Sequence, residues 1–294
     1  MRKLTSRSQR TIARPVCVRG VGYITGANVS LQFAPAPPST GIVFVRTDLP
    51  PQVCIPARID KVTGTSRRTT LGSMPRCVTV VEHVLAALAG LRIDNCYVEL
   101  NAIEPPGMDG SSRPFVKALR EAGIVDQSAD RDVWTVDRPL IVERNGATLT
   151  LHPAVGEELR ISYLLDYGGF NPIMPQRHSQ TIYPQSFINE IAPCRTYLLE
   201  AEAHELRRQG IGSRTRVTDL VVFGPQGPIE NKLRFADEPA RHKILDIIGD
   251  LALLGCDVRG HIVGYRSGHP LNAELTQELA DMIPTTTILQ SRAA

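Results

Sequence analysis

One segment near the C-terminal end combines an apolar helical pattern with regularly spaced polar residues. In the run 239–254, His242, Asp246 and Asp250 follow one another at intervals of four residues among isoleucines and leucines. On a helix this spacing places the three side chains on one face, with neighbours about 5–6 Å apart. Burying them without partners costs several kcal/mol. The segment therefore indicates either a solvated helix face or a buried polar site, and the apolar neighbours leave little room for a fully solvated stripe.

A second apolar helix is predicted over 80–91, with Glu82 and His83 at its start. Taken alone, a histidine at a helix start is more often a structural hydrogen-bonding residue. With His242 and Asp246, however, His83 would complete the three protein ligands of a catalytic zinc site, and Glu82 would stand where it can take a proton from water. The stretch 83–91 also resembles 242–251, which indicates either an internal repeat whose histidines meet or two unrelated amphipathic helices.

The remaining pattern predicts an α+β protein of two domains. Each half of the chain runs strands first and helices later. The polar, aperiodic segment 126–133 is taken as a linker between a first domain, 1–125, and a second domain, 134–294. Strands are expected at 42–46, 95–100, 134–143, 147–152 and 159–165, and helices at 80–91, 112–123, 186–191, 198–209 and 239–254.

Composition narrows the function classes. The 294 residues are 42% apolar and 21% charged, which is typical of a globular chain. A net charge of +3 and an aromatic content of 5% argue against a nucleic-acid binder. The six cysteines form no CxxC pair, which favours free thiols in a reducing compartment. We find neither a secretory signal nor an apolar stretch long enough to span a membrane, and we therefore expect a cytoplasmic protein.

Three other segments carry residues of chemical interest, each with an ordinary structural explanation. His269 stands in the Gly- and Pro-flanked stretch 267–272, which is predicted to be a loop with an exposed histidine. The hydroxyl of Thr196 can satisfy the backbone after Ala192-Pro-Cys. The segment 107–112 indicates a tight turn with a helix N-cap.

Taken in order, seven segments resemble the UDP-3-O-acyl-N-acetylglucosamine deacetylases, the zinc amidases of lipid A biosynthesis. They span nearly the whole chain, and seven motifs in one order are far more specific than any one of them. The segments are 35–49, 81–91, 108–116, 192–196, 233–238, 241–251 and 267–269.

The resemblance implies two α+β domains packed helix layer against helix layer, a β-α-α-β sandwich with the metal at the interface. His83, His242 and Asp246 match the zinc ligands, with one ion per chain, and Fe²⁺ also suits this ligand set. Glu82 matches the general base that activates water.

The same resemblance implies the remaining roles. His269 matches the residue that stabilises the oxyanion and protonates the leaving amine, with Asp250 orienting it. Thr196 matches a hydroxyl that donates to the oxyanion. Such groups suit amide hydrolysis, which needs activated water, charge stabilisation and a proton for a poor leaving group. The expected substrate-binding residues are Lys243, Tyr167 and His152.

The activity implied is removal of the N-acetyl group from a UDP-3-O-acyl-N-acetylglucosamine. The same chemistry on another acylated amino sugar or sugar nucleotide is one alternative. A catalytically silent sugar-nucleotide binder is another, against which the retained Glu82 and His269 argue. We expect a UDP-acyl-glucosamine as the partner, no nucleic acid, exchange of the acyl chain near a membrane, and a monomer.

The chain departs from the family pattern at three places. Gly22-Tyr-Ile-Thr-Gly26 replaces the usual Gly-Leu-His-Ser-Gly, and His152 stands where a lysine often precedes proline. Residues 212–218 replace a Gly-Gly-Ser segment of a small insert, here near 198–224, that helps to form a hydrophobic passage for the acyl chain. Arg214 and Arg216 there either point to solvent or narrow the passage, and the second alternative predicts a shorter or differently substituted acyl chain.

Overall fold

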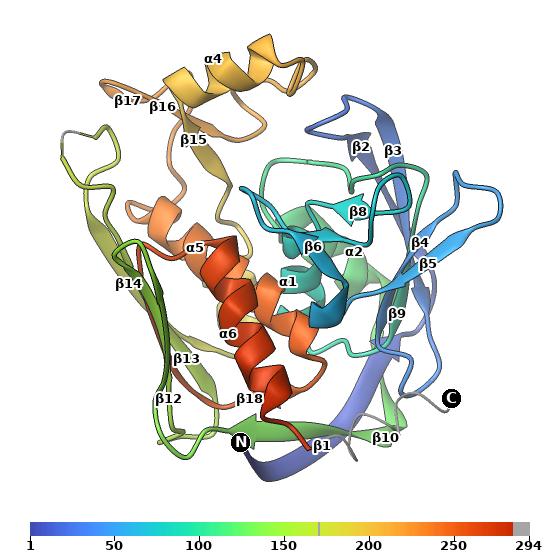
Figure 1. Ribbon diagram of the computed structural model, residues 1–294. Helices are drawn as coiled ribbons and strands as arrows, with labels where there is room; N and C mark the ends of the chain where they lie inside the picture. Colours follow the sequence, from blue (N-terminus) through green and yellow to red (C-terminus); the bar gives the residue numbers. More distant parts are fainter. Residues whose placement is uncertain (170, 285–294) are drawn as a thin grey trace.

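The computed structural model describes residues 1–169 and 171–284, and two five-stranded sheets form its outer layers (Figure 1). The first sheet has the spatial order β2 (Val16–Val21), β3 (Asn28–Pro35), β9 (Cys96–Leu100), β4 (Ile42–Arg46) and β5 (Val53–Pro56). The second has the order β11 (Leu140–Arg144), β12 (Ala147–His152), β19 (Gly260–Tyr265), β13 (Leu159–Leu165) and β14 (Gln176–Ile182).

Four helices lie between the two sheets, so the β-α-α-β layering expected from the sequence is confirmed (Figure 1). We call the first sheet with α1 and α2 the N-terminal unit, and the second sheet with α5 and α6 the C-terminal unit. A continuous cluster of buried apolar side chains runs through both units. The helices are α1 (Glu82–Gly90), α2 (Arg113–Ala122), α5 (Glu238–Leu251) and α6 (His269–Asp281).

The two units are built to one plan. In both sheets the successive pairings are antiparallel, antiparallel, parallel and antiparallel. One helix precedes the central strand and one follows it, α1 and α2 around β9, and α5 and α6 around β19. The internal repeat is therefore confirmed in the topology. The equivalent helices α1 and α5 pack against each other, which brings their histidines together.

Each unit carries a small three-stranded sheet at the same point, between its last edge strand and its first central helix. In the N-terminal unit this sheet consists of β6 (Val62–Gly64), β7 (Thr70–Leu71) and β8 (Val78–Thr79). In the C-terminal unit it consists of β15 (Tyr197–Leu199), β16 (Val221–Gly224) and β17 (Gly227–Pro228), with α4 (Glu200–Arg208) above it in Figure 1. Short helical turns cover Ile59–Lys61, α3 (Pro184–Ser186), Phe187–Ile191 and Ala252–Leu254.

The segment 126–133 is not irregular, and that part of the expectation is wrong. It is the middle of β10 (Ile124–Thr135), which pairs antiparallel with β1 (Arg2–Ile12) in a long ribbon and parallel with β18 (Asp257–Val258). Charged side chains cross this ribbon: Arg7 Nε lies 2.7 Å from Asp257 Oδ2, and Arg131 Nε lies 3.1 Å from Asp257 Oδ1. The polarity of 126–133 thus reflects a ribbon open to solvent. The proposed domain limits stay predictions.

Two further expectations need correction. The range 134–143 is not one strand, because β10 ends at Thr135 and β11 begins at Leu140. Residues 267–272 are not a loop, because α6 begins at His269 directly after the extended Gly268. Pro270 stands in the first turn, where a helix has no intrahelical use for the missing N–H. All six cysteines are free. Within the described ranges, no helix has the length and apolarity that spanning a bilayer requires.

Candidate active site

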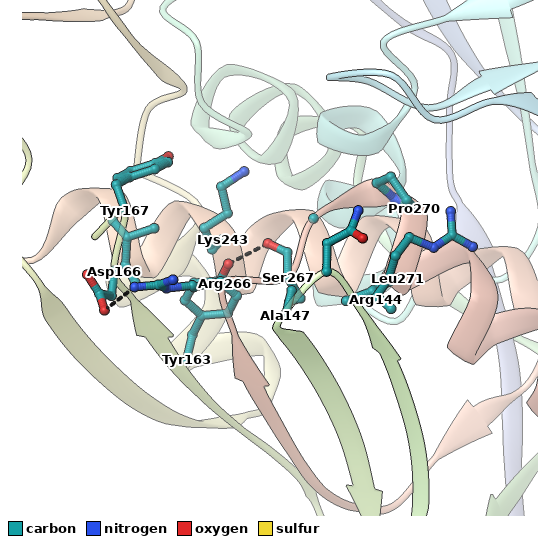
Figure 2. Close-up of a pocket in the computed structure, with 13 residues that line it drawn as sticks. Arg144, Ala147, Tyr163, Asp166, Tyr167, Lys243, Arg266, Ser267, Pro270 and Leu271 are labelled. Carbon is teal, nitrogen blue, oxygen red and sulfur yellow. Dashed lines mark hydrogen bonds and ion pairs between the residues drawn. The ribbon is translucent and has the colours of Figure 1, made fainter. Parts of the chain in front are cut away.

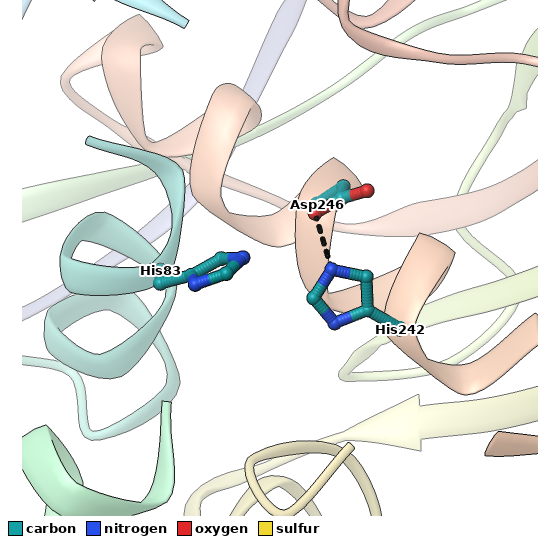
Figure 3. Close-up of side chains that lie close together, drawn as sticks. All are labelled: His83, His242 and Asp246. Carbon is teal, nitrogen blue, oxygen red and sulfur yellow. Dashed lines mark ion pairs between the residues drawn. The ribbon is translucent and has the colours of Figure 1, made fainter. Parts of the chain in front are cut away.

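His83, His242 and Asp246 converge between α1 and α5 (Figure 3). One ligand atom from each of these buried side chains lies within 4.8 Å of the other two. His242 and Asp246 are one turn apart on α5, with 3.3 Å between Nε2 and Oδ1. The two imidazole rings meet edge to face with centroids 5.1 Å apart. The two residues that the helical spacing groups on α5, His242 and Asp246, therefore lie beside His83 of α1, as the sequence predicts.

The charge states at this point suit metal ligands. Burial lowers the pKa of both imidazoles, that of His83 to about 3, so both are neutral at pH 7. Burial raises the pKa of Asp246, but the positive charge of Lys243 outweighs it and holds this pKa far below its ordinary value. His242 Nδ1 donates to the Cys194 carbonyl at 3.1 Å, which leaves the Nε2 lone pair toward Asp246. Two neutral imidazoles, an ionised carboxylate and an oriented ring form a donor set that fits a divalent zinc or iron ion.

Glu82 and His269 lie beside this cluster. His269 Nε2 is 4.0 Å from Glu82 Oε1 and 4.0 Å from Asp246 Oδ2. On the other side of the ring, Nδ1 lies 2.8 Å from Oδ2 of the fully buried Asp250. Burial raises the pKa of Glu82 to about 7. Burial lowers the pKa of His269, but the Asp250 carboxylate outweighs it and raises the pKa to about 9. A proton acceptor and a proton donor thus stand side by side.

A cavity of about 600 Å³ opens over these groups. Thr196 lines it, and its backbone N–H donates to the Gly110 carbonyl at 2.7 Å. Lys243 also lines it, with Nζ 2.8 Å from Asp246 Oδ2 and 5.7 Å from the centre of the Tyr197 ring. One limb of the cavity, whose wall includes α4, is mainly apolar, with the charged side chains of Glu202, Arg207 and Arg216 also in the cavity lining. This limb is lined by Leu198, Ala203, Leu206, Ile211, Val217, Leu220 and Val222.

A second cavity, of about 460 Å³, adjoins the first (Figure 2). Tyr167 and Lys243 line both cavities, and the Tyr167 hydroxyl donates to the Tyr197 hydroxyl at 3.0 Å. Charged side chains also line it beside Tyr167, where Arg266 Nη2 lies 2.6 Å from Asp166 Oδ2. The cavity over the reactive cluster and this charged cavity therefore adjoin at Lys243 and Tyr167.

Comparison with known proteins identifies the family. Residues 9–281 match the model of the family described as LpxC, UDP-3-O-acyl N-acetylglycosamine deacetylase. The chain belongs to this family. The UDP-3-O-acyl-N-acetylglucosamine deacetylase of Chlamydia muridarum is 39% identical over 95% of this chain and 97% of its own length. That of Hahella chejuensis is 38% identical over 92% of this chain and 90% of its own. The Bifunctional enzyme LpxC/FabZ of Chlorobaculum tepidum is 36% identical over 92% of this chain, which spans 64% of that longer protein.

Two expected site residues of this family member, Asp250 and His152, line neither cavity; Asp250 still joins the site through His269, whereas His152 does not. His152 ends β12 beside His261, with the two ring centroids 6.3 Å apart. Ala147, which begins the same strand, lines the second cavity. Five residues of extended strand at about 3.3 Å each place His152 about 17 Å further along. Its expected contact with substrate is therefore not supported by the strand register.

The two departures from the family pattern at 22–26 and 212–218 contact each other. Arg214 Nη1 donates to the Gly26 carbonyl at 2.8 Å and to Asn28 Oδ1 at 2.9 Å. The Gly212 N–H donates to the Tyr23 carbonyl at 3.0 Å. Arg216 pairs with Asp219, and its exposed side chain also lines the first cavity. Arg216 therefore adds charge to the rim of the cavity, as in the second alternative, whereas Arg214 lies outside that lining and fastens the segment 212–218 to the β2–β3 turn.

Sequence reasoning missed some polar residues that hold the site together. Arg195 and Glu238 form a buried pair, with 2.8 Å between Nε and Oε1, at the junction of the Thr196 segment and α5. Thr69 reaches the site from the loop before β7. Neither carries a periodic signal, because each acts through contacts with residues distant in sequence. The turn expected at 107–112 is structural, with Asp109 Oδ2 2.7 Å from Arg234 Nη2.

Proposed function

We propose that the chain hydrolyses the N-acetyl amide of a UDP-3-O-acyl-N-acetylglucosamine, using one Zn²⁺ ion held by His83, His242 and Asp246, with Fe²⁺ as the alternative. The observation that carries the proposal is a buried His₂Asp cluster beside a carboxylate–imidazolium pair in one cavity wall. Membership of the deacetylase family supports the reaction class. A bound divalent cation would supply a water of lowered pKa and polarise the amide carbonyl.

Glu82 is assigned as the general base. It precedes His83, and it lies outside the three-residue ligand cluster. One carboxylate oxygen faces His269 at 4.0 Å, and the other accepts the Thr69 backbone N–H at 3.1 Å. That second bond holds the carboxylate while its free oxygen takes a proton from the attacking water.

His269 is assigned as the general acid. Its Nδ1–H donates to Asp250, so the proton that it can deliver is on Nε2, the atom nearer the ligand cluster. An amine leaves poorly unless it is protonated, and this group supplies that proton. The Thr196 hydroxyl is assigned to the oxyanion, because the residue lines the same cavity and its backbone is fixed by Gly110.

The two adjoining cavities support the assignment of substrate. The mainly apolar limb, whose wall includes α4, suits an acyl chain, whereas Lys243 and Tyr167, which line both cavities, suit contact with the sugar nucleotide. The sequence-based expectations of a cytoplasmic monomer, and of acyl-chain exchange near a membrane, are retained as parts of the proposal.

The test is mass spectrometry of the metal-loaded protein incubated with UDP-3-O-acyl-N-acetylglucosamines, other acylated amino sugars and other acylated sugar nucleotides. We expect loss of acetyl from the first group. Turnover of only the other substrates would favour the alternative substrate class, and binding without product would favour a silent binder. Glu82→Gln should keep its metal and lose about 10²–10⁴ in rate. Undiminished metal in a His242→Ala, Asp246→Ala double variant would overturn the ligand assignment.

A further inference from the structure

Thr69 contacts both members of the proton-transfer pair, although it belongs to neither. Its side chain is fully buried in the loop between β6 and β7. Its hydroxyl donates to Asp250 Oδ1 at 2.6 Å and lies 3.4 Å from His269 Nδ1. Its backbone N–H donates to Glu82 Oε2 at 3.1 Å. One residue of the N-terminal unit therefore touches the base of its own unit and the Asp–His pair of the other.

The Thr69 hydroxyl completes the hydrogen bonding of Asp250. The Oδ2 atom of this carboxylate accepts from His269 Nδ1 and from Asn272 Nδ2, at 2.8 and 2.9 Å. Within the described ranges, Thr69 supplies the only hydrogen bond to Oδ1. An ionised carboxylate can only accept, so the hydroxyl proton must point at Asp250. Without that donor, a buried oxygen would lose its partner and the carboxylate could turn about its last torsion, carrying His269 with it.

Thr70, the neighbouring threonine, does not share the contact that Thr69 makes with Asp250. The Thr70 hydroxyl lies 2.7 Å from the Thr79 hydroxyl, inside the small β6–β7–β8 sheet, and takes no part in the site. Of the two adjacent threonines, only Thr69 faces Asp250. Thr70 therefore offers a matched control of the same residue type.

We propose that Thr69 is a positioning residue for the hydrolysis, fixing Asp250, and through it His269, in register with Glu82. The inference rests on the proposed function, because it assigns no separate reaction. The acid and the base come from different units, so the 4.0 Å between His269 and Glu82 depends on how the units meet. Catalytic groups must be held within about 0.5 Å of their working positions, and Thr69 bonds to both sides of this gap.

The experiment compares Thr69→Val, Thr69→Ser and Thr70→Val in the metal-loaded protein. Valine matches threonine in shape and keeps the backbone N–H to Glu82, but it lacks the hydroxyl. We expect Thr69→Val to lower kcat by about ten- to a hundredfold, with KM, metal content and Tm close to wild type. Thr69→Ser, which keeps the donor, should recover most of kcat. Thr70→Val should turn over as the wild type does.

The inference would be overturned if kcat of Thr69→Val equalled that of the wild type, or if the serine and valine variants lost kcat equally. The proposed function would still stand in either case, as long as the wild-type protein turns over its substrate. No turnover by the wild type would overturn both. If Thr69→Val does not fold, Thr69→Cys takes its place, because a thiol of similar size is only a weak donor. The same fall in kcat is then expected, and undiminished kcat in Thr69→Cys would reject the role.

Discussion

Gly249→Ala is a substitution for which the structure predicts the opposite of the usual effect. Gly249 lies in α5 where the helix crosses the backbone of Glu82 at the start of α1. A Cβ at this position would lie 2.9 Å from the Glu82 carbonyl carbon and 3.0 Å from its Cα, with the carbonyl oxygen nearer still. Ordinary contact begins at 3.4 Å, so the helices must separate by about 1 Å, because backbone atoms cannot turn aside.

Two opposing contributions set the size of the effect. Alanine gains about 1 kcal/mol over glycine in a helix interior, whereas overpacking a tight contact costs about 1–3 kcal/mol. The cost should fall at the upper end because the clash is with backbone, which leaves a net loss of about 1–2 kcal/mol. The larger effect is on catalysis. A displacement of about 1 Å between the helix that carries Glu82 and His83 and the helix that carries the other ligands should lower kcat about a hundredfold.

The assay measures Tm, kcat and metal content for Gly249→Ala and for Gly156→Ala. Gly156 is a matched control, since a Cβ there would meet nothing within 4 Å. We expect the control to behave as the wild type. Tm for Gly249→Ala should fall by a few degrees, at about 2–4 °C per kcal/mol, with turnover falling much further. A variant as stable as the wild type with unchanged kcat would refute the proposed close contact of α1 and α5.

Three other predictions follow from the same geometry. Chelation should lower Tm and added Zn²⁺ should restore it, because the proposed ligands come from two helices that a bound ion would tie together; an unchanged Tm contradicts this. Burial raises the pKa of Asp257, but Arg131 and Arg7 outweigh it, so the pKa is lower in the folded protein than in the unfolded one. The ion pairs of Asp257 therefore stabilise the fold fully above the unfolded pKa of about 4, and this stabilisation is lost as the pH falls through the folded pKa. The Tm deficit of Asp257→Asn should therefore shrink below about pH 4, and a pH-independent deficit opposes this. Arg216→Ala removes a charged side chain from the lining of the first cavity and should shift the substrate profile toward longer acyl chains, and a profile identical to that of the wild type rejects this role.

The parts of the site that could be predicted from the sequence are those that local periodicity determines. His242, Asp246 and Asp250 share a helical face in any packing, so their grouping is visible before the fold is known. The start of α6 was hidden because Gly268, His269 and Pro270 also suit a loop. The contacts of Thr69 depend on the docking of the two units, and no spacing of residues within its own segment predicts them.

The duplicated plan explains why the chemistry lies where it does. In each unit the helices cover one face of the sheet, and α1 of the N-terminal unit packs against α5 of the C-terminal unit. Polar groups on these helices are then forced into an apolar seam, where they are costly unless paired or bound to a metal. The small three-stranded sheets occupy the same position in the chain order of both units. Thr69 directly precedes a strand of the first small sheet and Thr196 directly precedes a strand of the second, and both threonines reach the site. Neither unit holds a complete set of the proposed ligands and proton-transfer groups, so the proposed mechanism requires the docked pair. Substitutions that loosen the seam should therefore abolish turnover before they unfold either sheet.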